Sequence, residues 1–142
     1  GLGTMTAPNP VAIQKCIQSA IENAGISAND IDYINGHLTA TSKDSLEIKN
    51  WSEALDRKGD DFPYINSLKS MVGHCLTAAG SIESVATVLQ LEQDFIFPNI
   101  NCEDLHPEIA EIVDESKIPT KLIHTPLNIV DKASFGCGDV IV

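Results

Sequence analysis

The sequence has little positive charge and no long apolar run, and each absence excludes a class of protein. Nine lysine and arginine residues stand against 20 aspartate and glutamate residues, which gives a formal net charge of −11. A field of this sign repels phosphate backbones and anionic lipid, so we expect no nucleic-acid partner and no membrane surface. No stretch reaches the roughly 18 consecutive apolar residues of a spanning helix. Residues 1–6 also lack the basic and apolar regions of a secretion signal.

Cysteines are few and widely spaced. Cys16, Cys75, Cys102 and Cys137 form no C-x-x-C pair, which excludes the common zinc patterns and a small disulfide framework. We therefore expect reduced thiols in a cytoplasmic protein, with no metal. The chain starts without Met on a segment rich in Gly, Thr and Pro, so we expect it to be cut from something longer.

The rest of the composition is that of a folded domain. The 142 residues are 43% hydrophobic and 20% charged, with a mean hydropathy of +0.01. A chain of this length encloses a core without disulfide or metal staples. One globular domain is predicted.

Apolar periodicity predicts three helices. The first starts at Asn9-Pro10 and ends at Gly25, and a second runs from residue 44 towards residues 57–59. Asp44 and Glu47 have the spacing of a capping box at the start of this second helix. A long helix begins near Gly73, and the Ala and Gly residues of its early turns indicate a second backbone packed close to it.

Strand signals alternate with these helices. Residues 31–34 and 62–66 predict short strands, and residues 103–115, which are acidic and have no basic side chain, predict a solvated connection with one helical turn. Residues 122–130 and 133–142 predict a closing antiparallel pair separated by Asp131-Lys132. The fold class predicted is α/β with a mixed sheet.

The first candidate site is the loop that follows the first strand. His37 comes directly after this strand, and Thr39 and Thr41 place hydroxyl groups on alternate residues. Loops after buried strands often carry functional side chains. The alternative is a polar connection whose threonines bond the backbone, and the loop taken alone favours that alternative.

The second candidate site precedes the long helix. His74 is predicted in the first helical turn, where the positive end of the dipole keeps the imidazole neutral and able to donate to a developing oxyanion. Lys69 lies just before the helix, and Glu83 lies within it, at a position from which it could pair with Lys69. The alternative is a polar helix start with two surface charges. The apolar neighbours of Glu83 weigh against that alternative.

The third candidate site is the glycine-containing segment 134–139. Phe135, Gly136, Cys137 and Gly138 lie within a β-rich stretch, where alternate glycines indicate a tight turn or a close approach of backbone to ligand. The alternative is a simple hairpin turn.

Together and in this order, the three loops resemble the C-terminal half of a β-ketoacyl-acyl-carrier-protein synthase of the thiolase-like superfamily. In that family a strand ends in H-G-T-G/S-T, a second segment contains S-x-K-x-x-x-G-H-x-x-x-A-A-G-x-x-E, and the chain closes with N-S-F-G-F-G-G. The counterparts here are residues 37–41, 67–83 and 133–139. Residues 98–101 are similar to the family's P-x-I-N segment, and the similarity runs from residue 4 to the C-terminus.

The resemblance implies a fold, a reaction and a role for each matched residue. The fold is one half of the αβαβα condensing-enzyme fold, with a mixed sheet of about five strands and helices packed on it. The reaction is a decarboxylative Claisen condensation of an acyl thioester with a malonyl thioester. His37 and His74 would stabilise the enolate oxygen, Lys69 would anchor the network around His74, and Glu83 would fix Lys69. Thr39 and Thr41 would support this site.

The sequence departs from the family pattern in two of the loops. Leu38 replaces a glycine and Ala40 another small residue, so we expect the loop after His37 to be tighter or turned differently. The segment Phe135, Gly136, Cys137 and Gly138 would line and gate the acyl pocket. Cys137 replaces a phenylalanine there, which indicates altered control of chain length. Ala133 and Asp139 replace an asparagine and a glycine.

The family's nucleophilic cysteine belongs to the N-terminal half, and none of the four cysteines here matches it. Residues 1–142 are therefore expected to be a C-terminal domain that is inactive alone. The expected partners are the N-terminal half, acyl carrier protein and a second copy in a homodimer. No cofactor is expected, because the carrier's phosphopantetheine holds the substrates. We also expect apolar surface where the N-terminal half would pack, and hence self-association of the isolated chain.

Two alternatives stay open. One is a non-catalytic partner subunit that resembles a chain-length factor, and the other is an unrelated acidic binding module. A further difficulty is that acyl carrier proteins are acidic, as this chain is. Either docking uses the other half, or lysines such as Lys43, Lys69 and Lys132 suffice. The acyl chain, and the choice between fatty acid and polyketide synthesis, also stay open.

Overall fold

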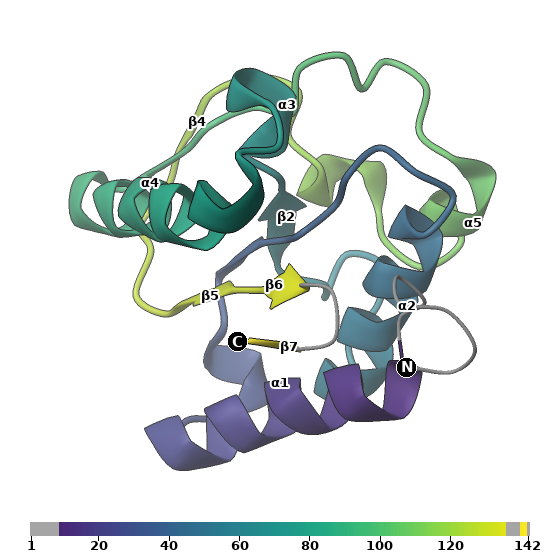
Figure 1. Ribbon diagram of the computed structural model, residues 1–142, viewed down its shortest axis with the longest axis vertical. Coiled ribbons are helices and arrows are strands. Elements are labelled where there is room, and N and C mark those ends of the chain that lie inside the picture. Colours follow the sequence, from purple (N-terminus) through teal and green to yellow (C-terminus); the bar gives the residue numbers. More distant parts are fainter. Residues whose placement is uncertain (1–8, 136–139, 142) are drawn as a thin grey trace.

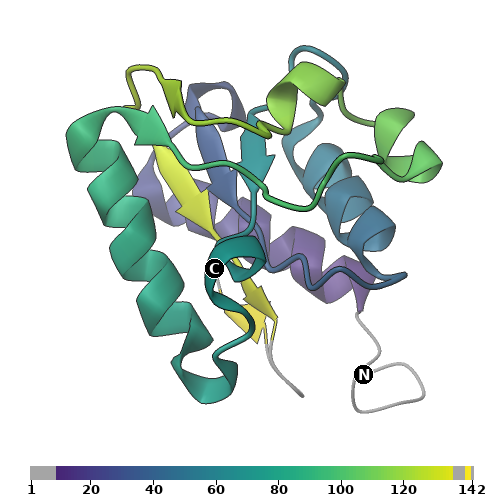
Figure 2. The ribbon, with the colours of Figure 1, turned by 90° about the horizontal axis from the view of Figure 1, so that it is seen from above.

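The computed structural model describes residues 9–135 and 140–141. At its centre lies a parallel sheet of three strands in the order β2-β1-β5. These strands are β1 (Tyr33–Asn35), β2 (Tyr64–Asn66) and β5 (Val130–Lys132). Helices α1 (Pro10–Ala24) and α2 (Asp44–Leu55) cover one side of the sheet, and α4 (Ala79–Gln93) lies on the other side (Figures 1 and 2).

Smaller elements complete the chain. Two antiparallel pairs of short strands lie outside the central sheet: β3 (Phe95–Ile96) with β4 (Ile123–His124), and β6 (Ser134–Phe135) with β7 (Val140–Ile141). Single helical turns are α3 (Lys69–Val72), α5 (Pro107–Ala110) and the 3-10 turns Ala28–Asp30, Leu76–Ala78 and Glu115–Lys117. None of the helices in the described ranges is long and apolar enough to cross a bilayer. The α/β class is confirmed.

The first helix begins and ends where its sequence signals place it. The Asn9 side chain accepts the backbone N–H of Ala12 at 3.3 Å, and Gly25 ends the helix in the left-handed conformation at φ 66°. Its buried face is formed by Ile13, Ile17 and Ile21. Burial of such side chains contributes about 1.5–3 kcal/mol each. The predicted helix over residues 10–24 is therefore confirmed.

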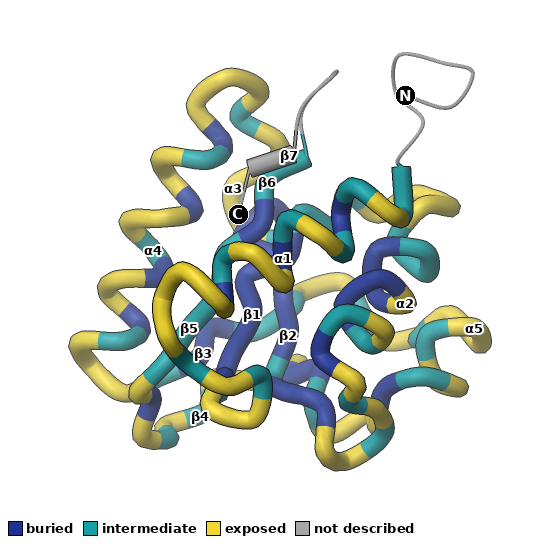
Figure 3. The backbone as a smooth tube through the Cα atoms, turned by 90° about the horizontal axis from the view of Figure 1, so that it is seen from below, coloured by how far each residue is buried: buried dark blue, intermediate teal, exposed yellow. Residues whose placement is uncertain are grey.

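The two sides of the sheet are packed differently. Between the sheet and α1 and α2 the core is apolar and includes Trp51, Phe62 and Ile34. The inner face of α4 is instead polar, because Glu83, Thr87 and Gln90 are its buried side chains beside Ala79. Its outer face carries exposed apolar side chains, namely Ile82, Val85, Val88 and Leu89, and Figure 3 shows the exposed outer turns of this helix. The expected exposed apolar surface is thus present on α4.

The long helix starts later than predicted. Gly73, at φ 75°, ends α3, and α4 begins only at Ala79, so His74 does not lie in the first turn of α4. The close neighbour expected at the early turns of this helix is a side chain rather than a backbone: a Cβ added at Gly80 would lie 3.3 Å from Ser134 Oγ of β6.

The predicted closing pair is wrong. Asp131 and Lys132 do not form a turn, because both belong to β5, which pairs in parallel with Ile34 and Asn35 of β1. The parallel pairing with β1 provides hydrogen-bond partners for the backbone of this polar strand. Most of the segment predicted as residues 122–130 instead connects β4 to β5.

The predicted capping box is also wrong. Lys43 precedes α2 without a side-chain cap, and α2 ends at Leu55, with Asp56 in the left-handed conformation, rather than near Gly59. Glu47 and Asp44 bind the preceding loop instead, as described below. The acidic connection does contain one helical turn, α5, as predicted.

Candidate active site

Parallel pairing brings two of the three candidate loops together. The loops after β1 and β2 leave the same edge of the sheet, and the N–H of Gly36 donates to Asn66 O at 2.8 Å. Just beyond this bond, the Ser67 hydroxyl donates to His37 O at 3.4 Å. The loop that carries His37 therefore lies directly against the segment that leads to Lys69.

The rings of His37 and His74 meet at this edge. Their centroids are 5.5 Å apart and the ring planes are 84° from parallel. On another side, the Phe135 ring of β6 contacts His37 with centroids 5.6 Å apart. The three loops singled out in the sequence thus converge on one histidine.

The predicted ion pair between Lys69 and Glu83 is present and buried. Lys69 Nζ lies 2.5 Å from Glu83 Oε1, and the two side chains are 6% and 2% exposed. The surface-charge alternative is excluded for both residues. Lys132 Nζ lies 2.5 Å from the other oxygen of Glu83, a contact that the sequence analysis missed.

The two histidines differ in environment. Burial, followed by the positive charge of Lys69, lowers the pKa of His37 to about 4, so its ring is neutral near pH 7. His74 is exposed, and its Nδ1 accepts the N–H of Leu76 at 3.1 Å. In a neutral ring this contact leaves the proton on Nε2, which can donate. His74 lies before α4, so the predicted effect of the helix dipole on its ring does not apply. The bond from the N–H of Leu76 orients the ring instead.

Two carboxylates on α2 hold the loop that contains His37. Glu47 is buried, and its oxygens accept the N–H groups of His37 at 2.7 Å and Leu38 at 2.9 Å. Burial raises the pKa of Glu47 to about 7, against the opposing effect of these two bonds. In the sequence, the spacing of Glu47 from Asp44 instead predicts a helix cap.

Asp44 binds the next three residues of the same loop. Its carboxylate accepts the N–H groups of Thr39, Ala40 and Thr41 at 3.0–3.3 Å, and Ala40 has a φ of 57°. The hydroxyls of Thr39 and Thr41 lie 3.3 Å from each other. Asp44 therefore holds the backbone of residues 39–41, and the Thr41 hydroxyl accepts the N–H of Lys43 at 3.3 Å.

A cavity of about 400 Å³ is lined by His74 but not by His37. Its other polar lining comes from Thr39, Asp44, Ser67, Lys69, Ser70, Asn99 and Asn101. The remainder is mostly apolar, with Leu38, Ile48, Ile65, Ile100, Cys102, Leu105, Ile109 and Ile118. Its size and lining suit an organic chain that carries few polar groups.

Part of the third loop lies outside the described residues. This applies to Gly136, Cys137 and Gly138, whereas Phe135 is described and lies against His37. The described ranges contain no cluster of three or more His, Cys, Asp or Glu side chains arranged to hold a metal ion.

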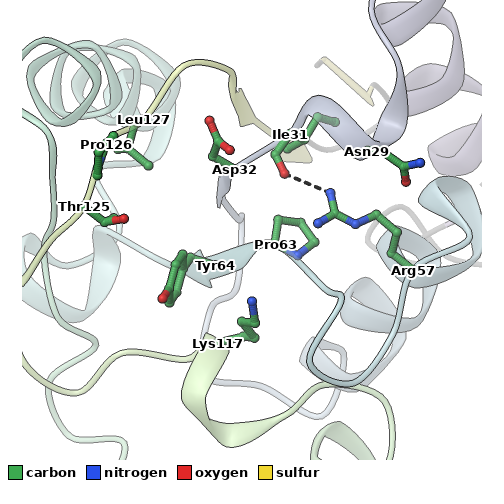
Figure 4. Close-up of a pocket in the computed structure, with 10 residues that line it drawn as sticks. All are labelled: Asn29, Ile31, Asp32, Arg57, Pro63, Tyr64, Lys117, Thr125, Pro126 and Leu127. Atoms are coloured by element: carbon green, nitrogen blue, oxygen red, sulfur yellow. Dashed lines mark hydrogen bonds between the residues drawn. The ribbon is translucent and has the colours of Figure 1, made fainter.

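A second cavity, of about 170 Å³, lies at the opposite ends of the central strands, near the starts of β1 and β2. Arg57 lines it and donates to Ile31 O at 2.8 Å (Figure 4). Lys117 lies over the ring of Tyr64, with Nζ 5.1 Å from the ring centroid. None of the predicted site residues within the described ranges lines this cavity.

Comparison with known proteins identifies the family. Residues 2–103 match the family described as Beta-ketoacyl synthase, C-terminal domain. The chain is 39% identical over 137 residues to 3-oxoacyl-acyl-carrier-protein synthase 1 of Haemophilus influenzae, covering 94% of this chain and 31% of that protein. It is 34% identical over 136 residues to the chloroplastic synthase I of Arabidopsis thaliana, covering 94% of this chain and 28% of the relative.

Solved structures agree with these relatives. The ishigamide ketosynthase/chain length factor superposes with a TM-score of 0.86 at 28% identity, over 97% of this chain and 33% of that one. The AntDE:AntF complex, of a type II polyketide acyl-carrier protein with its ketosynthase bound to the hexaketide, gives a TM-score of 0.79 at 32% identity, over 99% and 34%. The chain thus spans about a third of the length of the proteins it matches, and it belongs to the β-ketoacyl synthase family, as a ketosynthase C-terminal domain.

Proposed function

We propose that this domain supplies the two histidines that stabilise the enolate in a decarboxylative condensation. The observation that carries the proposal is the contact between the His37 and His74 rings, whose centroids are 5.5 Å apart, with His74 in the lining of a largely apolar cavity. Two neutral imidazoles that face one developing oxyanion act as paired hydrogen-bond donors. His37 is neutral because of its burial, and the proton of a neutral His74 lies on Nε2.

In the proposed reaction, the bond between the malonyl α-carbon and its carboxylate breaks and carbon dioxide leaves. The electron pair of that bond moves towards the thioester oxygen, where the histidines stabilise the charge. The enolate carbon then attacks the carbonyl of an acyl group held as a thioester on a cysteine, and the thiolate of that cysteine leaves. Each step conserves atoms and electrons without a metal or redox partner.

We propose that an N-terminal half supplies this cysteine. Two observations support the proposal: the relatives are about three times as long as this chain, and α4 turns Ile82, Val85 and Leu89 outward. The face of α4 that points away from the sheet is apolar, although it is exposed in this chain. Such a face is typical of a helix that packs against a second partner. Acyl carrier protein is the proposed substrate carrier, and the AntDE:AntF complex of a related ketosynthase with its carrier supports it.

The test is the release of radiolabelled carbon dioxide from malonyl carrier protein by the full-length protein, run beside acyl transfer to its cysteine. His74→Ala should lose about 2–4 kcal/mol of transition-state stabilisation, the range for one deleted oxyanion donor, and should keep acyl transfer. His37→Ala should behave alike, and the double variant should be less than additive because both rings serve one oxygen. His124→Ala, an exposed histidine on β4, is the matched control. If His74→Ala releases carbon dioxide at the wild-type rate, His74 is structural and the proposal is wrong. A wild type that releases no carbon dioxide favours the non-catalytic, chain-length-factor-like subunit instead.

A further inference from the structure

Lys132 makes a set of contacts that nothing in the family resemblance assigns. Its ammonium lies 2.5 Å from Glu83 Oε2 on α4, donates to Ala133 O at 2.5 Å, and donates to the hydroxyl of Ser134 on β6. The side chain is only 13% exposed. The ammonium therefore contacts three oxygens: one on α4, one on β6 and one on Ala133, which lies between β5 and β6.

These contacts join α4 to β6, the strand whose Phe135 ring contacts His37. Glu83 belongs to α4 and also pairs with Lys69, the residue at the start of α3. Ser134 directly precedes Phe135, whose ring contacts the ring of His37. Lys132 is thus the link between the buried ion pair and the strand that packs on the histidine.

The charges around His37 do not balance. The formal charges of Lys69, Glu83 and Lys132 sum to +1, although burial, opposed by Glu83, lowers the pKa of Lys132. The buried Glu47 of α2 accepts the backbone N–H of His37, and the His74 ring contacts the His37 ring. Lys132 is one of the positive groups that lower the pKa of His37, after burial, Lys69 and His74.

We propose that Lys132 is a positioning residue that holds β6 on Glu83, sets Phe135 against His37, and keeps a net positive charge behind the two histidines. Without it, the Lys69–Glu83 pair would be neutral and the short β6 strand would lose its polar anchor on α4. A positive triad favours the negative oxygen of an enolate and disfavours protonation of His37. Only the catalytic consequence rests on the proposed function.

The first test follows the His37 ring by NMR titration in full-length protein with labelled histidine. Lys132→Met should raise the pKa of His37, because a nearby positive charge is lost, and Lys132→Arg should restore the wild-type value. Lys121→Met is the charge-matched control, since Lys121 is exposed and precedes β4, and it should leave the pKa unchanged. Should Lys132→Met fail to fold, Lys132→Gln keeps a hydrogen-bond donor without the charge and should show the same rise. An unchanged pKa in the folded variant overturns the proposal, as does an equal rise in Lys121→Met.

The second test separates this proposal from the proposed function. Lys132→Met should lower kcat for carbon dioxide release by about tenfold to a hundredfold, as expected when a reacting group is misplaced, with acyl transfer and KM largely kept. Lys132→Arg should recover most of the rate. If His74→Ala is slow and Lys132→Met is not, the positioning role is wrong while the proposed function stands. If neither variant is slow, the proposed function fails, and the His37 titration still decides whether Lys132 sets the charge around the ring.

Discussion

Glu47 should make the stability of the domain depend on pH in a way that a single substitution removes. Its carboxyl group is buried on α2, and burial raises its pKa from the ordinary 4.5 to about 7. The folded state therefore holds this proton more tightly than the unfolded state. Between these two pH values the folded state binds more protons, so the free energy of unfolding falls as pH rises.

The size of the effect follows from the two pKa values. They differ by about 2.5, and each pKa unit is worth about 1.4 kcal/mol, so Glu47 stabilises the fold by about 3 kcal/mol more below pH 4.5 than above pH 7. His37 acts in the opposite direction, because its lowered pKa adds stability as pH rises from about 4 to 6.5. The wild type alone will therefore show a smaller slope than Glu47 itself produces.

The assay is denaturant unfolding at several pH values, followed by the fluorescence of Trp51, which is fully buried on the same helix. The difference in unfolding free energy between wild type and Glu47→Gln should fall by about 3 kcal/mol from pH 4.5 to pH 8. Glu53→Gln, an exposed carboxylate on α2, is the control and should show no such trend. A difference that stays constant with pH would refute the argument that burial controls Glu47.

Three further predictions concern single positions. Val85→Asp should cost little in the isolated chain, because Val85 is 62% exposed, but should disrupt packing of the full-length protein, as measured by soluble yield and thermal unfolding. Gly73→Ala should destabilise by about 1 kcal/mol or more, since φ is 75° there, and calorimetry should show a lower Tm. Asn9→Ala should cost about 1 kcal/mol by removing the cap of α1, and Asn9→Ser should recover most of it in denaturant unfolding.

Some parts of the site could be predicted because they follow from the sequence of strands and loops or from neighbouring residues in one helix. His37 and Lys69 follow consecutive parallel strands, and such loops leave the same edge of a sheet, so their proximity follows from the topology. Glu83 lies among apolar residues of its helix, and a carboxylate there needs a buried cation. The first helix was predictable for a similar reason, because Asn9 and Gly25 mark its ends chemically.

The rest depends on contacts between distant residues. Lys132 resembles a turn residue in sequence, and only Glu83 on α4 makes a buried lysine acceptable in strand β5. Asp44 and Glu47 have the spacing of a capping box, but the loop before α2 folds back and presents N–H groups from residues 37–41 to both carboxylates. A local motif gives no information on which of two sets of N–H groups a carboxylate will bind.

The charge of the whole chain and the charge of the site have opposite signs, and this bears on carrier docking. The net charge of −11 arises largely from exposed carboxylates, which solvent and salt screen beyond about 10 Å. The Lys69–Glu83–Lys132 triad is largely buried, and its two lysines, together with burial, lower the pKa of His37. Both of its lysines are engaged with Glu83 and contribute little to a docking surface, which corrects the expectation that they could attract an acidic carrier. Of the three lysines considered, Lys43 alone is exposed and so remains available to the proposed acidic carrier.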